Sequence, residues 1–194
     1  MDVAGAWRFL EQSDLVASAE EVQAALRRVA SDVEARLAGA YPLVLAVMGG
    51  AVVFAGQLLP LLRFPLDFDY IHVSRYGAGT RGAAVDWRVT PTESVRGRAV
   101  LVVDDILDRG HTLAALGQEL AQIGVAAQLT AVLVVKRVAA SEPRPRVHFA
   151  GVEVDDVYVF GCGMDYRGHW RGLRALYALE APHARDPGAA GRAP

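Results

Sequence analysis

The sequence predicts an α/β fold in which a parallel sheet is the core and helices cover both of its faces. Several short segments are apolar throughout, and they alternate with longer segments of helical periodicity. One apolar segment ends in paired aspartates followed by a glycine turn. Strands that are buried on both faces are typical of parallel sheets, which bind ligands at the carboxyl ends of their strands. The 194 residues, 53% of them hydrophobic, predict a single domain over residues 1–182.

The first half of the chain predicts two helices and two strands. Residues 18–39 form the first helix, since Ser18 and Glu21 have the spacing of a capping box and Gly39 ends the segment. Its apolar positions recur at helical spacing: Val22, Leu26, Val29, Val33 and Leu37. A short strand, residues 42–50, then runs into two glycines. A helix over 51–62 that ends near Pro60 and a strand over 66–76 follow.

The second half predicts three further strands and one helix. The strands are expected at residues 98–105, 128–138 and 154–161, and the helix at 111–124, where Gly124 closes it. Residues 183–194 contain too few large apolar side chains to fold. We therefore expect a flexible tail after the single domain.

Composition and charge exclude several classes of protein. No apolar run approaches the roughly 20 residues that span a bilayer, and the first residues carry no signal pattern, so we expect a soluble, cytoplasmic protein without a membrane partner. The net charge of −2 arises from interspersed acids and bases, which argues against a nucleic-acid partner. Cys162 is the only cysteine, and the five histidines show no metal-ligand spacing with it. We expect Cys162 to be a packing residue.

The segment Val100–Leu113, "VLVVDDILDRGHTL", carries the clearest chemical signal. A strand over Ala99–Val103 brings Asp104 and Asp105 to the sheet edge, and Gly110 permits the turn that follows. The next helix offers free backbone N–H groups and the Thr112 hydroxyl to a phosphate. The two carboxylates can accept hydrogen bonds from sugar hydroxyls or hold hydrated Mg²⁺. A ribose phosphate would use both the carboxylates and the free N–H groups of the helix. Capping the helix, by contrast, would not require three aspartates.

This segment resembles the phosphoribosyl-pyrophosphate (PRPP) signature of type I phosphoribosyltransferases. The resemblance covers roughly residues 10–180, and the flanking segments are similar to hypoxanthine-guanine phosphoribosyltransferases. It implies the fold of that family, with a small hood formed by about residues 1–40 and 161–182. It also implies a purine salvage enzyme that transfers the 5-phosphoribosyl group from PRPP to hypoxanthine or guanine. The products would be IMP or GMP and pyrophosphate, and Mg²⁺ would be the cofactor.

The resemblance assigns roles to the residues of the signature. Asp104 and Asp105 would contact the ribose hydroxyls and, with Asp165, Mg²⁺. Asp108 would be the general base beside N7 of the purine. The 5′-phosphate would lie in the loop formed by Asp108, Arg109, Gly110, His111 and Thr112. Arg109 and His111 depart from the commonest residues of this loop, but both can donate hydrogen bonds.

Other segments match the family one at a time. "VMGG" resembles the pyrophosphate loop that follows a non-proline cis peptide, which implicates Met48 and Gly49, although a lysine is more usual at position 48. "VSRYG" is similar to the mobile lid, with Ser74 and Tyr76 as its closing residues and Arg75 inserted between them. The purine would be bound by the Lys136 ammonium, the Tyr158 ring, the Val159 backbone and Asp165, while Arg171 would reach pyrophosphate.

Two other classes of protein remain possible on the sequence alone. A regulatory protein that senses PRPP or nucleotides could share the fold, but it would not need Lys136, Asp108, Tyr158 and Asp165 together. "GAGTRG", Gly77–Gly82, matches the glycine pattern of dinucleotide-binding oxidoreductases. That pattern must open a helix, and the residues that follow it here do not have helical spacing. We expect PRPP and a 6-oxopurine as partners of a homodimer or homotetramer.

Overall fold

The computed structural model describes residues 1–75, 85–138 and 144–179. Tyr76, the Gly77–Gly82 motif and the expected tail at 183–194 therefore lie outside the described residues. The helices are α1 (Val3–Glu11), α2 (Ala19–Leu37), α3 (Val52–Leu58) and α4 (His111–Ile123), with short 3₁₀ turns at Leu59–Leu61 and Glu93–Val95. The strands are β1 (Asp14–Ala17), β2 (Leu43–Met48), β3 (Asp67–Arg75), β4 (Val85–Val89), β5 (Ala99–Leu107), β6 (Ala127–Arg137), β7 (Phe149–Asp155), β8 (Tyr158–Phe160) and β9 (Leu176–Leu179).

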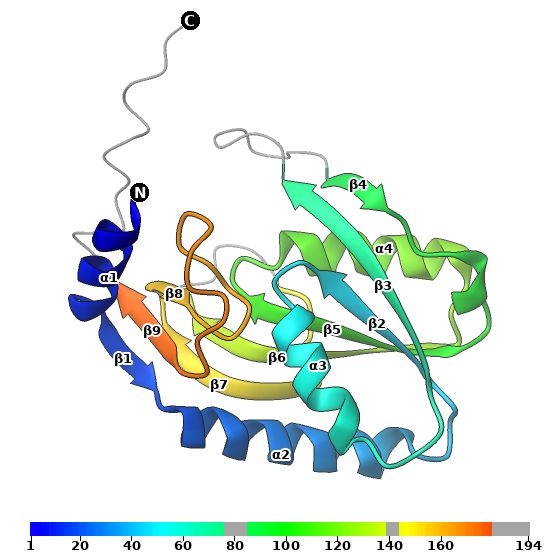
Figure 1. Cartoon of the computed structure of the whole chain (residues 1–194). Coiled ribbons are helices and arrows are strands. Elements are labelled where there is room, and N and C mark those ends of the chain that lie inside the picture. Colours follow the sequence, from blue (N-terminus) through cyan, green and yellow to red (C-terminus); the bar gives the residue numbers. More distant parts are fainter. Residues whose placement is uncertain (76–84, 139–143, 180–194) are drawn as a thin grey trace, which may run out of the picture.

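The main sheet confirms the predicted fold class. Its strand order is β4-β3-β2-β5-β6-β7, in which the pairs from β3 across to β7 are all parallel and β4 alone pairs antiparallel, at one edge. The chain proceeds outward from β2 to β3 in one direction and from β5 to β7 in the other (Figure 1). The reversal places a crevice at the carboxyl ends of β2 and β5, where sheets of this kind bind their ligands.

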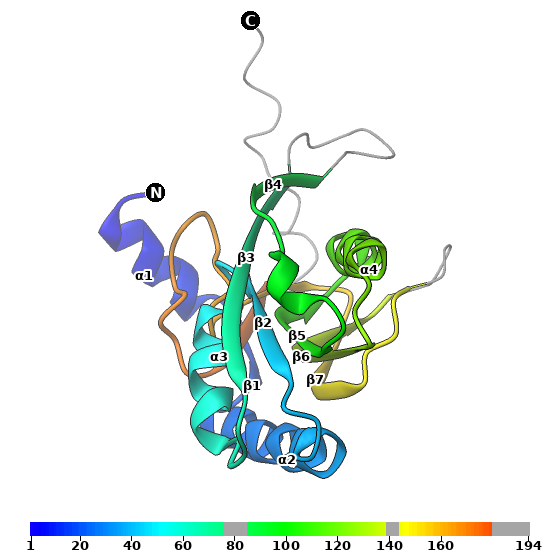
Figure 2. The ribbon, with the colours of Figure 1, turned by 90° about the vertical axis from the view of Figure 1, so that its right-hand side faces the viewer.

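Helices cover both faces of the sheet, as the apolar pattern predicted. α3 and α4 lie on opposite sides of the strands (Figure 2). α2 and α3 pack one face, and the predicted positions from Val22 to Leu37 are all buried in that layer. α2 begins with the expected capping box, in which the Ser18 hydroxyl accepts from Glu21 N at 3.2 Å and Ser18 N donates to the Glu21 carboxylate at 2.7 Å.

A second, smaller unit sits beside the carboxyl edge of the main sheet. It consists of α1 and an antiparallel sheet in the order β1-β9-β8, and we call residues 3–17 and 158–179 the hood. The expected hood of residues 1–40 was too long, because α2 covers the main sheet instead. The amphipathic spacing of α2 had already indicated a helix with a wide buried face.

The fifth parallel strand was predicted at the wrong place. The expected strand over 154–161 is divided, since β7 (Phe149–Asp155) joins the main sheet and β8 joins the hood. The chain turns between them, where Val157 N donates to Asp155 O at 2.8 Å. β7 is an edge strand with exposed positions, so it lacks the continuous apolar run that identified the others. None of the described helices is long and apolar enough to cross a bilayer.

Candidate functional site

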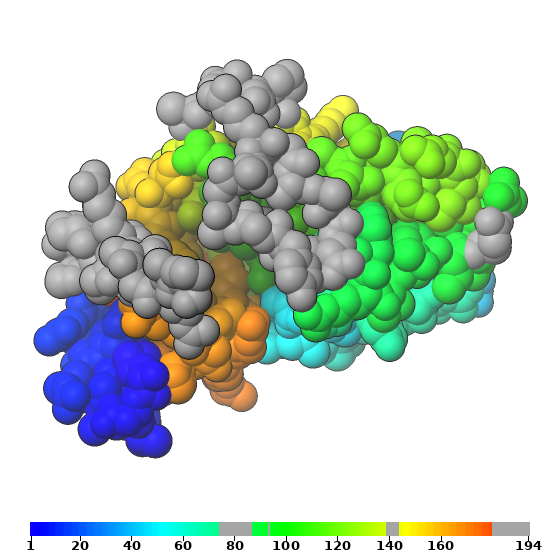
Figure 3. All heavy atoms as spheres, turned by 90° about the horizontal axis from the view of Figure 1, so that it is seen from above, coloured from blue at the N-terminus to red at the C-terminus, as the bar shows by residue number. Residues whose placement is uncertain are grey.

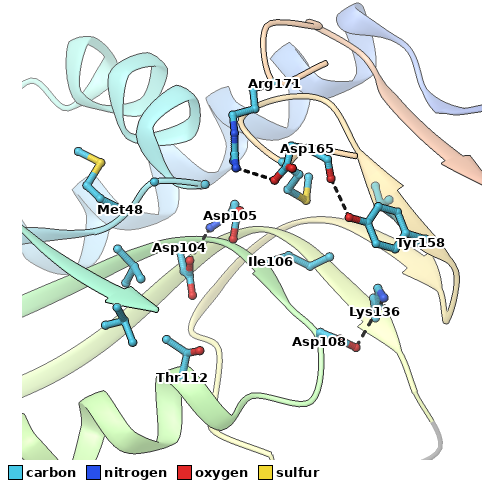
Figure 4. Close-up of a pocket in the computed structure, with 16 residues that line it drawn as sticks. Met48, Asp104, Asp105, Ile106, Asp108, Thr112, Lys136, Tyr158, Asp165 and Arg171 are labelled. Carbon is cyan, nitrogen blue, oxygen red and sulfur yellow. Dashed lines mark hydrogen bonds and ion pairs between the residues drawn. The ribbon is translucent and has the colours of Figure 1, made fainter. Parts of the chain in front are cut away.

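A cavity of about 430 Å³ opens at the crevice between β2 and β5 (Figure 4). The main sheet, the α4 N-terminus and the hood all contribute to its walls. Most of the predicted site residues line it: Met48, Gly49, Asp104, Asp105, Asp108, Thr112, Lys136, Tyr158, Val159, Asp165 and Arg171. Arg109, Gly110 and His111 do not. Ser74 lies in β3, but its side chain and all of Tyr76 are outside the described parts of the chain, so the lid remains a prediction.

The paired aspartates project from β5 before that strand ends. β5 was expected over 98–105, with Ala99–Val103 as the part that precedes the aspartates, but it continues to Leu107 because Ile106 and Leu107 still pair with β6. Asp104 is only 7% exposed, and its carboxylate accepts a hydrogen bond from Asp105 N at 2.9 Å. Burial raises the pKa of Asp105, while hydrogen bonds from Asp104 and from backbone N–H groups partly oppose that shift.

The loop predicted to bind pyrophosphate lies against these acids. The Met48–Gly49 peptide is cis, as the family resemblance implied. A Cβ on Gly50 would overlap the Asp105 carboxylate, and a Cβ on Gly163 would overlap Gly50 O. The close approach of β2, β5 and the hood therefore depends on glycine at both positions.

The predicted phosphate loop turns at Gly110, which has a φ of 84° and is the N-cap of α4. A Cβ there would lie 2.6 Å from Pro145 Cδ. Thr112 faces the cavity from the first turn of α4, where free N–H groups and the positive end of the helix dipole favour an anion. His111 is exposed and outside the cavity lining.

Asp108 and Lys136 lie next to each other at one side of the cavity, at the ends of the neighbouring strands β5 and β6 (Figure 4). Lys136 Nζ lies 3.6 Å from Asp108 Oδ1, and that oxygen is buried without a hydrogen-bond partner among the described residues. Arg144 ties the two strand ends together, since its guanidinium donates to Leu107 O and to Lys136 O, both at 2.9 Å. One arginine thus holds the backbone at both predicted site residues, and no sequence motif had identified it.

The hood closes the opposite wall of the cavity. Arg171 contacts Asp165 Oδ1 at 2.6 Å and donates to Gly163 O at 2.7 Å. The Tyr158 hydroxyl donates to Asp165 O at 2.8 Å, and burial followed by the Asp165 charge raises the pKa of Tyr158. Asp165 therefore links the residue predicted to stack on the purine with the residue predicted to bind pyrophosphate.

The N-terminal helix supports this wall from behind. The Trp170 indole donates to Ala6 O at 3.2 Å and meets the Trp7 ring edge-on at 4.8 Å. Phe9 stacks on Tyr166 with ring centroids 3.9 Å apart. Figure 3 shows α1 in blue directly against the orange loop that carries these residues.

The site offers carboxylates for a cation but no complete protein cage. In the ranges that the structure describes, no three histidine, cysteine or acidic side chains are grouped so as to hold a metal ion.

Cys162 is buried, its thiol donates to Arg174 O at 3.3 Å, and burial raises the pKa of that thiol to about 11. Cys162 is therefore protonated at neutral pH, as expected of a packing residue.

Five lining residues were not predicted: Val47, Gly50, Val73, Ile106 and Met164. Gly50 lies in the "VMGG" segment and Ile106 in "VLVVDDILDRGHTL", so membership of these motifs could have identified both as lining residues. Val47 and Val73 belong to apolar strand ends, where side-chain type alone does not separate lining from core. Met164 becomes part of the site only because the hood folds back over the sheet.

Comparison with known proteins agrees with this geometry. Residues 14–167 match the phosphoribosyl transferase domain. A hypoxanthine-guanine phosphoribosyltransferase of Bacillus subtilis is 29% identical over 164 residues, which cover 84% of this chain and 91% of the relative. Its counterpart from Lactococcus lactis is 30% identical over 143 residues, or 73% and 77% of the two chains.

A solved structure extends the likeness to three dimensions. A hypoxanthine-guanine phosphoribosyltransferase from Bacillus anthracis, 26% identical, has a TM-score of 0.80 over 86% of this chain and 98% of its own. The sequence match, the shared fold and the acids at the end of β5 lead to one conclusion. The chain belongs to the phosphoribosyltransferase family, among the relatives named hypoxanthine-guanine phosphoribosyltransferases.

Proposed function

We propose that this chain transfers the 5-phosphoribosyl group from PRPP to hypoxanthine or guanine, giving IMP or GMP and pyrophosphate. One observation carries the proposal. Asp108 and Lys136 face each other 3.6 Å apart in the same cavity that holds Asp104 and Asp105. Asp108 can accept a proton and the Lys136 ammonium can bind an oxygen of the base. Both lie in one cavity with the two carboxylates that can bind the ribose hydroxyls.

Each part of PRPP can be assigned to residues on one side of the cavity. The first turn of α4 and the Thr112 hydroxyl bind the 5′-phosphate, and Asp104 and Asp105 accept hydrogen bonds from the ribose hydroxyls. The backbone at Gly49 and the Arg171 guanidinium bind pyrophosphate. Arg171 is already held by Asp165 and Gly163 O, so it approaches the ligand with its side chain positioned.

The residues also suit Mg²⁺ bound together with the substrate. Mg²⁺ commonly takes one or two protein carboxylates and completes its shell with water and substrate phosphates. Asp104, Asp105 and Asp165 supply such carboxylates on two walls of one cavity. Bound there, Mg²⁺ would neutralise the charge that collects on pyrophosphate as it leaves.

The reaction depends on stabilising the charges that develop, and it requires no nucleophile from the protein. As the bond from ribose C1 to pyrophosphate breaks, positive charge develops on the ribose and negative charge on the leaving group. Arg171 and backbone N–H groups stabilise the departing anion. Asp108 accepts the proton from N7 of the purine, and the Tyr158 ring holds the base against C1. We further propose that the lid at Ser74 and Tyr76 excludes water, and that the chain works as a homodimer or homotetramer.

Selection of the base tests this proposal. The Lys136 ammonium only donates, so it pairs with the 6-oxo group of hypoxanthine or guanine and opposes the 6-amino group of adenine. Leaving a buried polar group unpaired costs about 1–3 kcal/mol, which is roughly tenfold or more in catalytic efficiency. We also expect xanthine to be poor, since its 2-oxo group would meet backbone acceptors near Val159 and the Asp165 carboxylate.

The measurement is kcat/KM for hypoxanthine, guanine, xanthine and adenine at saturating PRPP and Mg²⁺, repeated with Lys136→Ala. Arg137→Ala is a suitable control, because Arg137 follows Lys136 in β6 but contacts Asp155 outside the cavity. Lys136→Ala should lose the preference for 6-oxopurines, while the control keeps it. Equal efficiency with adenine and hypoxanthine in the unaltered chain would refute the assignment.

A further inference from the structure

We propose that Asp156 is a positioning residue that holds the Lys136 ammonium in place for the 6-oxo group of the purine. Asp156 lies in the turn between β7 and β8 and does not line the cavity. Its role rests on the proposed function, because the alignment of Lys136 matters only if Lys136 binds the base. No part of the sequence pattern had singled out Asp156.

The two carboxylate oxygens of Asp156 face two different cations. Oδ2 accepts a hydrogen bond from Arg109 Nη2 at 3.0 Å, and Oδ1 lies 3.9 Å from Lys136 Nζ. Arg109 belongs to the predicted phosphate loop, and Lys136 lies near the end of β6. One side chain from the turn before the hood therefore contacts both predicted substrate subsites.

Lys136 needs such support because its own side chain does not fix its ammonium. A lysine head on four methylenes has many rotamers, and this one is only 13% exposed. Two acids attract it, Asp108 at 3.6 Å and Asp156 at 3.9 Å. Both distances exceed the usual hydrogen-bond range of about 2.7–3.2 Å. The ammonium is balanced between two acids while its N–H groups stay available to a ligand oxygen.

Without Asp156, Asp108 would be the only acid within 4 Å of Lys136 Nζ among the described residues. The ammonium would then shift toward the carboxylate that we propose as the general base. Such a shift weakens the contact with the purine oxygen, and it also occupies the proton acceptor with a charge-assisted hydrogen bond. The same change would leave the Arg109 guanidinium without its carboxylate partner.

This arrangement also accounts for Arg109. Its side chain is half exposed, pairs with Asp156 and does not line the cavity. Its position in the loop, between Asp108 and Gly110, places it one residue from the general base. We infer that Arg109 anchors Asp156 and so transmits the position of the phosphate loop to the purine side of the site.

The test compares Asp156→Asn with Asp155→Asn. Asp155 is the adjacent residue, is likewise paired with an arginine, Arg137 at 2.8 Å, and is more exposed, but it does not approach Lys136. Each variant removes one negative charge and keeps the side-chain shape. Thermal unfolding of both variants checks that the fold is intact before the kinetics are measured.

We expect Asp156→Asn to raise the KM for hypoxanthine about tenfold while the KM for PRPP changes less than twofold. The ratio of kcat/KM for hypoxanthine to kcat/KM for adenine should fall by a similar factor. Asp155→Asn should match the unaltered chain in both respects, and Asp156→Glu should recover part of the loss. Binding of IMP, measured by calorimetry, should weaken in parallel.

Two results would overturn the assignment of Asp156 while the unaltered chain remains active. One is a hypoxanthine KM in Asp156→Asn equal to that of Asp155→Asn. The other is an equal rise in both KM values together with a lower melting temperature, which indicates a purely structural role. An unaltered chain that turns over no 6-oxopurine would instead contradict the proposed function itself, and the role of Asp156 with it.

Discussion

At neutral pH the buried charge of Asp105 opposes folding, although the same charge is proposed to bind the ribose hydroxyls of PRPP. Burial raises the pKa of Asp105, so the unfolded chain releases this proton at a lower pH than the folded chain does. Between those two pKa values the folded state binds more protons than the unfolded state, so the free energy of unfolding falls as the pH rises. Above both values the full cost of the buried charge is present.

Asp105→Asn should therefore stabilise the protein while it impairs PRPP binding. We expect the free energy of unfolding at pH 7 to rise, because the buried charge is gone. The gain should disappear below the ordinary pKa of an aspartate, where the native carboxyl is protonated in both states. Denaturant titrations across the acid range measure it, and a gain that did not vary with pH would exclude this cause.

Asp108→Asn tests the general base. The substitution preserves shape but removes the anionic acceptor, so turnover should fall by roughly 10² or more while PRPP binding changes little. Asp155→Asn again serves as the control, because it lies outside the cavity. Turnover of Asp108→Asn at the level of that control would remove Asp108 from the role.

The sequence was informative about single residues where a motif fixes their spacing. Asp104 and Asp105 lie in the last part of one strand and Asp108 follows it directly, so their common location could be predicted from local geometry alone. Asp156 and Arg144 could not, because they act through contacts with strands that are distant in the chain. Arg144 meets its partners only after β5 and β6 have paired, and Asp156 only after β7 has joined β6.

At the level of elements, the turn into α4 depends on one backbone conformation. Gly110 has a φ of 84°, and a side chain there would also collide with Pro145. Gly110→Val should disrupt the turn and sharply weaken PRPP binding, since the N–H groups of the first turn lose their alignment. Calorimetric titration with PRPP on the folded variant measures the effect.

Gly56→Ala provides the matched control for that variant. Gly56 lies within α3, and a methyl group added there would meet no atom within 4 Å beyond its own helix backbone and chain neighbours. Alanine should be neutral there, or should stabilise the helix by about 0.5–1 kcal/mol. Unchanged PRPP affinity in a folded Gly110→Val protein would place the phosphate elsewhere.

Most predicted strands are uniformly buried, although β3 was also predicted and its burial is mixed. β2, β5 and β6 are apolar nearly throughout because both faces are covered. β7 lies at the edge and alternates with exposed positions, and β1, β8 and β9 are only three or four residues long. Such short strands are stabilised by tertiary contacts, which local sequence does not encode.

For the whole molecule, the site depends on two units that are folded by different parts of the chain. The main sheet positions Asp104, Asp105, Asp108 and Lys136, and the hood brings Tyr158, Asp165 and Arg171 to face them. The parallel sheet followed from the sequence pattern. The location of the hood did not, because it combines the first residues of the chain with the last described ones.

The contact between Trp170 and α1 gives the molecule a built-in optical signal. Trp170 precedes Arg171 directly, and its indole is held by Ala6 O and the Trp7 ring. Pyrophosphate bound by Arg171 would bring negative charge close to this indole, so the fluorescence of Trp170 should change. Emission followed during titration with pyrophosphate should respond in the unaltered chain and much less in Trp170→Phe, so that ligand arrival can be timed without a label.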